Sequence, residues 1–133
     1  MTPNLNVIGV VVTDMTKSLD FYRRLGLDVP PGENDNPHVE HVLPGGARIM
    51  WDTEATIHSF DPEWSAPAGH GRIALAFECA SPGEVDRLHD ELVQAGYTSH
   101  KAPWDAFWGQ RYCCVRDPDG NSVDLYAATA APQ

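Results

Sequence analysis

Aromatic side chains gather in one short stretch and are the residues best suited to hold a small molecule. Trp104, Phe107 and Trp108 precede Tyr112 closely, and Phe60 and Trp64 stand further upstream. Ring contacts add roughly 0.5–1.5 kcal/mol per pair beyond burial, so two or three rings could clamp a planar molecule. Packing in a core is the alternative for these rings, and both interpretations remain open.

Polar and adaptable side chains near these rings could orient the polar arms of a ligand. We expect this role for His38, Asp52, Arg72 and Asp124, and we expect Met50 to form an adaptable wall. For Asp124 the alternative is a solvated strand residue, and for Met50 it is core filling.

Metal chemistry is disfavoured by the spacing of the histidines. No two of the six have the i,i+4 spacing of a helical zinc site. His38 and His41 are three apart on a predicted strand, so they point to opposite faces. His89 is expected on the polar side of a helix, in contact with water. We expect no metal and no cofactor.

Nucleophilic chemistry is equally unsupported. The chain has neither a Gly-x-Ser-x-Gly elbow nor a phosphate-binding loop. Cys79, Cys113 and Cys114 form no C-x-x-C pair, and Cys113 and Cys114 are expected to be buried, inert thiols.

Length and charge narrow the possible partners. The sequence has 133 residues and a net charge of -10, and hydrophobic residues make up 42% of it. We predict a single folded domain over residues 1–133. The negative charge disfavours nucleic acid and anionic membranes as partners.

Neither a signal peptide nor a membrane-spanning stretch is recognised, so we expect a cytoplasmic protein with reduced thiols.

The two halves of the chain follow the same order of elements. A β-branched strand over residues 7–12 leads to Asp14 as a helix N-cap, and Gly26 ends that helix. A second strand over residues 73–79 leads to a capping box at Ser81, and Gly96 ends the second helix. These signals recur after about 70 residues, which indicates an internal duplication.

Short strands follow each helix. We expect them at about 38–43 and 47–52 in the first half, and at 98–103, 111–116 and 122–127 in the second. Each half is read as βαβββ, over about 5–53 and 70–128. The loop 53–71 between them is either a functional lid or a mobile linker.

Strand alternation assigns the side chains to two faces. We expect one parity to pack under the helices, namely Ile8, Val10, Val12, Ile73, Leu75, Phe77, Val123 and Leu125. The opposite parity would face a mostly apolar cleft and contains Val7, Gly9, Val11, Arg48, Met50, Asp52, Arg72, Ala74, Tyr112, Cys114, Ser122, Asp124 and Tyr126.

The motifs of the chain resemble those of the vicinal oxygen chelate superfamily, which includes glyoxalase I, extradiol dioxygenases and bleomycin-resistance proteins. The residues that carry the resemblance are 7–14, 18–22 and 25–27, with 116–125 the most specific. The resemblance implies an α+β fold in which two tandem βαβββ modules form a curved mixed sheet around a cleft. It also implies a homodimer with the cleft at or near the subunit interface.

The metal ligands of the related enzymes can be carried over position by position. The resemblance places them at Val7, Met50, Ala74 and Asp124, of which Asp124 alone retains a carboxylate. Because catalytic zinc normally needs three protein ligands, we expect the inherited metal site to be absent.

The sequence therefore favours a non-catalytic protein that sequesters a bulky, partly planar antibiotic or natural product and so confers resistance. The alternative is a metal-dependent lyase, isomerase or dioxygenase of the glyoxalase type with a relocated metal. A third hypothesis is a metal-free enzyme that uses Tyr112 or His38 as a general acid or base.

Overall fold

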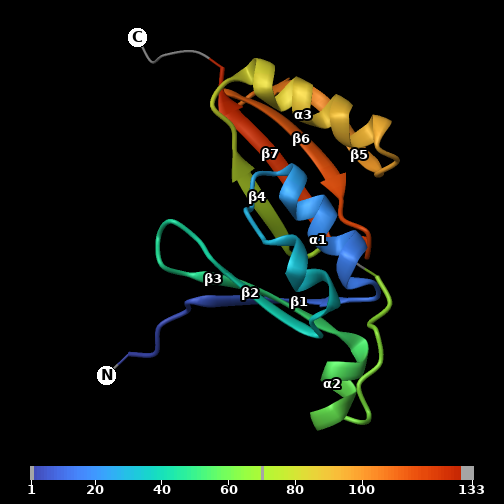
Figure 1. The fold of residues 1–133 in the computed structure, drawn as a ribbon. Helices are drawn as coiled ribbons and strands as arrows, with labels where there is room; N and C mark the ends of the chain where they lie inside the picture. The colour runs from blue at the N-terminus through green and yellow to red at the C-terminus, as the bar shows by residue number, and fades with distance from the viewer. Residues whose placement is uncertain (1, 70, 130–133) are drawn as a thin grey trace. The chain divides into compact units, whose positions relative to one another are not determined.

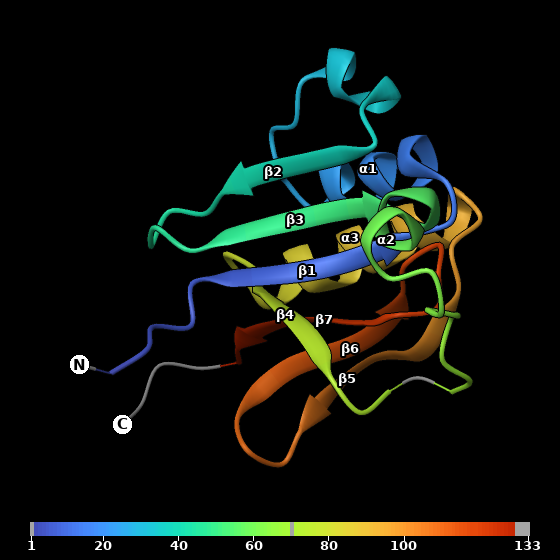
Figure 2. The same ribbon diagram turned by 90° about the horizontal axis from the view of Figure 1, so that it is seen from below.

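The protein has an α+β fold whose strands form two mixed sheets, seen from two directions in Figures 1 and 2. The computed structural model describes residues 2–69 and 71–129, so position 70, where the second module was expected to begin, lies outside them. The chain divides into two compact units, Met1–Pro67 and Ala68–Gln133. No helix in the described part of the chain is long and apolar enough to cross a membrane.

The first unit is a three-stranded sheet with one main helix. Its elements are β1 (Val7–Val12), α1 (Met15–Arg24), the short 3-10 helix η1 (Pro31–Asp35), β2 (His38–Val42), β3 (Arg48–Thr53) and α2 (Glu54–Phe60). The strand order is β1-β3-β2, with β1 parallel and β2 antiparallel to β3 (Figure 2). The strands β2 and β3 form a hairpin that turns at Gly46, where φ is 94°.

Helix α1 begins and ends where the sequence predicts. The Asp14 side chain accepts a hydrogen bond from the Lys17 N–H at 3.0 Å, and Gly26 follows the helix with φ at 100°. Leu19 and Tyr22 are fully buried, and the Tyr22 ring lies 5.5 Å from that of Trp51. The helix therefore covers the face of the sheet to which Trp51 belongs.

The second unit is a complete βαβββ module. It consists of β4 (Ala74–Glu78), α3 (Pro82–Gln94), β5 (Ser99–Ala106), β6 (Gln110–Arg116) and β7 (Ser122–Ala128). The strand order is β4-β7-β6-β5, with β4 parallel to β7 and the other pairs antiparallel. Helix α3 lies along one face of this sheet (Figure 1).

The predicted capping box starts α3, with one difference. The Ser81 hydroxyl accepts from the Glu84 N–H at 3.2 Å, while the Glu84 carboxylate accepts from the N–H of Ala80 rather than of Ser81. The buried side of α3 presents Val85, His89 and Leu92 to the sheet. Val123 and Leu125 on β7 are fully buried on the same side.

Five expectations about the fold are wrong. The segment after residue 53 is not irregular throughout, because Thr53 caps helix α2, which spans Glu54–Phe60. The chain enters this helix instead of a fourth strand, so the first module is βαββ. Ile73 is 82% exposed because it lies before β4 begins, and Ile8 is exposed near the start of β1. His89 is buried against β5 and pairs with the Ser99 hydroxyl at 2.7 Å.

Candidate ligand-binding surfaces

The face of each sheet that lies opposite its helix carries the side chains of chemical interest. In β3, Ile49 and Trp51 are buried, so Arg48, Met50 and Asp52 occupy the other face. In the second unit, Val123 and Leu125 are buried, and Asp124 and Tyr126 therefore project oppositely. The predicted division of side chains between the two faces is confirmed for these strands.

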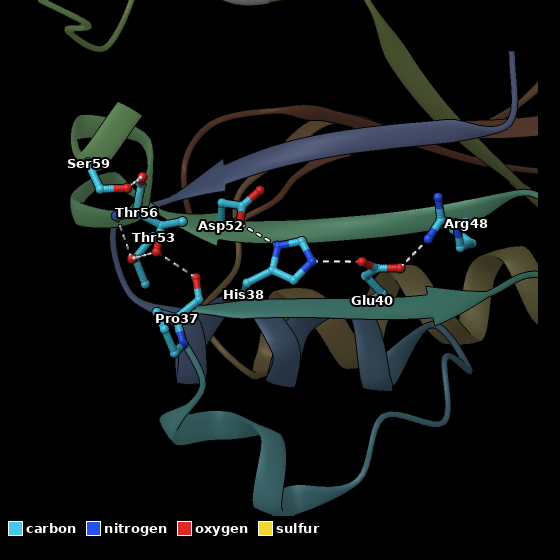
Figure 3. Close-up of polar contacts among 8 residues, drawn as sticks. All are labelled: Pro37, His38, Glu40, Arg48, Asp52, Thr53, Thr56 and Ser59. Carbon is cyan, nitrogen blue, oxygen red and sulfur yellow. Dashed lines mark hydrogen bonds and ion pairs between the residues drawn. The ribbon is translucent and has the colours of Figure 1, made fainter. Parts of the chain in front are cut away.

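Four polar side chains form a row across β2 and β3, here called the polar row: Arg48, Glu40, His38 and Asp52 (Figure 3). His38 Nδ1 lies 2.5 Å from Asp52 Oδ1, directly across the strand pair. His38 Nε2 lies 2.7 Å from Glu40 Oε2, and Arg48 donates to Glu40 Oε1 at 2.5 Å. The charges thus alternate along the row.

His38 carries a proton on both ring nitrogens when both of its carboxylate partners are ionised, because a carboxylate can only accept hydrogen bonds. The hydrogen bonds with Glu40 and Asp52 raise the pKa of His38 above 6.5. The hydrogen bond from His38, together with the Arg48 charge, lowers the pKa of Glu40. Two cations and two anions make the row neutral overall.

A second set of contacts in Figure 3 fixes the end of the row near Asp52. The Thr56 hydroxyl donates to the Pro37 carbonyl at 3.1 Å, and the Thr53 N–H donates to the same oxygen at 3.0 Å. Thr53 also caps α2 by accepting from the Thr56 N–H at 3.2 Å. The start of β2 is therefore tied to the junction of β3 and α2.

The second unit gathers five rings, here called the aromatic cluster: Trp104, Phe107, Trp108, Tyr112 and Tyr126. Trp104, Trp108 and Tyr112 contact one another edge to face, with ring centroids 5.6–6.0 Å apart. Tyr112 stacks on Tyr126 at 6.1 Å. Phe107 is 96% exposed and Trp108 is 49% exposed, so the cluster offers rings to solvent at the β5–β6 turn.

The Tyr112 hydroxyl donates a hydrogen bond of 2.6 Å to Asp124, which lies on the neighbouring strand β7. Partial burial, followed by this hydrogen bond, raises the pKa of Tyr112. Asp124 thus has one oxygen occupied by a phenol. The same site includes Cys114, whose pKa is raised to about 11 by burial and by the nearby Asp124 carboxylate.

The cysteines do not form a reactive site. Cys113 is buried as expected, whereas Cys114, which was also expected to be buried, is partly exposed; Cys79 is buried too. Burial raises the pKa of Cys113 to about 12 and also raises that of Cys79. Since the thiolate is the nucleophile, the raised pKa values lower the thiolate fraction of these cysteines at neutral pH.

The positions that the resemblance assigns to metal ligands do not fit a metal ion. Val7 and Ala74 have no donor atoms, Met50 offers only a thioether, and Asp124 is bonded to Tyr112. Over residues 2–69 and 71–129, no group of three His, Cys, Asp or Glu side chains could hold a metal. In the polar row the two carboxylates meet different nitrogens of one imidazole, so they do not converge on one point.

Phe60, Trp64 and Arg72 are members of neither the polar row nor the aromatic cluster. Phe60 is 70% exposed at the end of α2. Trp64 follows α2 and contacts His58, which donates to the Trp64 carbonyl at 2.8 Å. Arg72 is exposed and lies just before β4, outside the alternation that was expected to turn it inward.

Two members of the polar row were not predicted as site residues. Glu40 lies two residues after His38 on β2 and therefore on the same face, whereas Arg48 reaches Glu40 across the hairpin, in which residues equidistant from Gly45 pair. The turn at Pro44-Gly45-Gly46 was recognised in the sequence, so this register was available as a signal. Tyr126 was placed on the correct face but not among the candidate residues.

Known proteins resemble the chain over nearly its whole length. A curated relative, the uncharacterized protein YraH of Bacillus subtilis, is 29% identical over 126 residues, which are 90% of this chain and 94% of YraH. A glyoxalase/bleomycin resistance protein/dioxygenase family enzyme from Burkholderia phytofirmans has a TM-score of 0.80 at 18% identity, covering 95% of this chain and 99% of that one.

Another solved structure is similar in fold. It is a glyoxalase-related enzyme from Fulvimarina pelagi, with a TM-score of 0.77 and 21% identity, covering 95% of this chain and 88% of that one. The family model described as the Glyoxalase/Bleomycin resistance protein/Dioxygenase superfamily matches residues 4–125. Both the sequence match and the folds agree with the resemblance carried by the motifs, and the chain belongs to the glyoxalase/bleomycin resistance protein/dioxygenase superfamily.

Proposed function

We propose that the protein binds a bulky, partly planar small molecule without transforming it, and that the aromatic cluster supplies the main contact surface. The observation that carries the proposal is the exposure of Phe107 and Trp108 above Trp104 and Tyr112. The Trp108 ring contacts Trp104 and Tyr112 and its indole N–H donates to Gln110, so this ring loses little conformational freedom when a flat ligand stacks on it.

The occupants of the family's metal positions support binding rather than catalysis. Val7, Met50 and Ala74 provide no hard ligand, and the Asp124 carboxylate already accepts the Tyr112 phenol. An apolar wall with a few polar groups is the usual composition of a drug-sized site. The Tyr112–Asp124 pair would then orient the ligand through hydrogen bonds at the edge of the ring surface.

Resistance by sequestration is the biological role that this proposal favours. A cytoplasmic binding protein would lower the free concentration of an antibiotic before the drug reaches its target. We further propose that the protein works as a homodimer, which sedimentation at micromolar concentration tests. A species with the 14.6 kDa mass of a single chain would contradict the dimer.

A titration with DNA-binding antibiotics tests the proposed function. A glycopeptide, an enediyne and a quinone are added in turn to the purified full chain, and binding is measured by tryptophan fluorescence and calorimetry. We expect saturable binding of at least one, and Trp108→Ala should weaken it about tenfold, because lost ring contacts cost roughly 1.4 kcal/mol.

A matched control separates ring contact from general loss of apolar surface. Val93→Ala removes an apolar side chain that is also exposed, at 43%, but lies on α3. It should leave the affinity unchanged. No binding by any antibiotic, or equal affinity in wild type and Trp108→Ala, would overturn the proposal.

A further inference from the structure

The Glu40 carboxylate is shared between two cations from different strands. Its Oε1 accepts from Arg48 on β3, and its Oε2 accepts from His38 on β2 at 2.7 Å (Figure 3). Each oxygen of one carboxylate therefore meets its own charged donor. A carboxylate of another molecule would find the same two donors in the same spacing if Glu40 moved aside.

The two acidic partners of His38 differ in accessibility. The Asp52 side chain is 15% exposed, whereas Glu40 is 37%, Arg48 is 40% and His38 is 42% exposed. Asp52 thus holds the imidazole from the protected side. Glu40 is the solvent-facing partner, and it can rotate into water without leaving a buried charge behind.

Apolar side chains lie beside the polar row on the same face. Across the sheet, Glu40 faces Met50, and Met50 faces Gly9 on β1. A Cβ at Gly9 would meet only the end of the Met50 side chain, at 4.0 Å. On β1, Val7 and Val11 flank Gly9 on this face. An apolar strip that has no side chain at Gly9 therefore adjoins the two cationic donors.

We infer that Arg48 and His38 form a binding site for the carboxylate of an organic acid with an apolar body, and that Glu40 occupies this site when no such ligand is bound. The ligand carboxylate takes the place of Glu40 between the two donors, while the apolar body lies over Met50 and Gly9. The site belongs to the first unit and does not rest on the proposed function.

The exchange conserves the charge pairing of the site. One carboxylate replaces another between the same cations, so the apolar contacts of the ligand strengthen its binding. Competition by Glu40, which is tethered to the chain, weakens it. The charged groups near His38 are Glu40 on β2 with Asp52 and Arg48 on β3, while β1 adds uncharged residues. Deprotonation of His38 removes one donor, so binding weakens at alkaline pH.

Histidine NMR of the full chain tests the site with benzoate as the probe. We expect benzoate to shift the His38 ring signals saturably, while the neutral analogue benzamide leaves them unchanged. Phenylphosphonate, added in a separate arm, reports whether phosphate-type anions also enter. His41 lies on β2 but points to the other face, so its signals serve as the internal reference.

Two conservative variants separate the roles of the donors and the competitor. Glu40→Gln should bind benzoate about tenfold more tightly, because the tethered competitor is gone, and Arg48→Gln should bind it about tenfold more weakly. Arg87→Gln, which removes an arginine that pairs with Glu84 and Glu91 on α3, is the matched control and should leave this titration unchanged. No saturable shift in wild type, an equal response to benzamide, or no gain in Glu40→Gln would overturn the inference.

Discussion

Replacing Tyr112 by Phe isolates the hydrogen bond to Asp124 from the ring contacts around it. The substitution removes only the phenol oxygen, which donates to Asp124 at 2.6 Å. The Phe ring can still stack on Tyr126 and contact Trp104 and Trp108. Any loss in the free energy of unfolding therefore reports the hydrogen bond.

The magnitude follows from the partial burial of this pair. A hydrogen bond to a charged group contributes about 1.5–3 kcal/mol when well buried. Both residues are only half-buried, so water replaces the phenol at Asp124 in the variant. We expect a loss of about 1 kcal/mol, or roughly 4 °C in Tm for a chain of this size.

Urea denaturation followed by tryptophan fluorescence measures this loss, with Tyr126→Phe as the matched control. The Tyr126 hydroxyl forms no hydrogen bond with any residue that the structure describes, so the control should lose less than about 0.5 kcal/mol. Since the folded-state pKa of Tyr112 is raised above 10, its contribution is present below pH 10 and is lost as pH rises further.

The reasoning would be refuted if Tyr112→Phe and Tyr126→Phe lost the same free energy. A loss above about 3 kcal/mol would also contradict it, because that value exceeds what a half-buried hydrogen bond supplies. The ring packing, rather than the phenol–carboxylate pair, would then govern the stability of this face.

Four further perturbations test other parts of the structure. His38 has a raised pKa, so its stabilising contribution is present below pH 6.5 and is lost as pH rises through the folded value; His38→Asn should flatten that alkaline decline in a pH series of Tm. Glu40 has a lowered pKa, so its contribution is lost as pH falls below 4.5, and Glu40→Gln should remove that acidic decline. Asp117 is buried and accepts hydrogen bonds from the Asp119 N–H, the Asn121 N–H and the Asn121 side-chain amide. Asp117→Ala should lower the free energy of unfolding by about 2–3 kcal/mol, measured by urea denaturation. A loss below about 1 kcal/mol would contradict this account of the β6–β7 turn. Zinc, manganese or EDTA should each leave Tm within about 1 °C, whereas a metal at a hundred times its Kd would stabilise a real site by about 2.7 kcal/mol.

Local backbone signals could be predicted from the sequence because they depend on neighbouring residues. The caps at Asp14 and Ser81 and the glycine stops at Gly26 and Gly96 lie where the spacing predicts. Helix α2 was missed because it has seven residues and none is buried, which leaves no apolar period to detect. Its one signal was Thr53, whose side chain caps the Thr56 N–H.

Side-chain partners were harder to predict because they depend on the positions of several elements. His89 was assigned to solvent beside Leu88, yet the helix turns Val85, His89 and Leu92 inward at i, i+4 and i+7. The Ser99 hydroxyl on β5 makes that burial tolerable by pairing with the imidazole.

The aromatic cluster and the polar row show the same limit at the candidate sites. Trp104, Trp108 and Tyr112 were predicted to gather because they are close in sequence, and their ring contacts confirm it. Asp52 was expected to be available to a ligand, but it is bonded to His38. That pair joins residues from two strands, so alternation alone places them on one face but does not reveal their partnership.

Calorimetry on metal-free protein tests the central claim, ligand binding without a metal, most directly. Chain treated with EDTA and chain reloaded with zinc or manganese are titrated with the antibiotic that quenches the tryptophan fluorescence. The account predicts saturable binding with the same affinity in all samples, and recovery of unchanged ligand. Binding or chemical conversion that appears only after metal is added would contradict it.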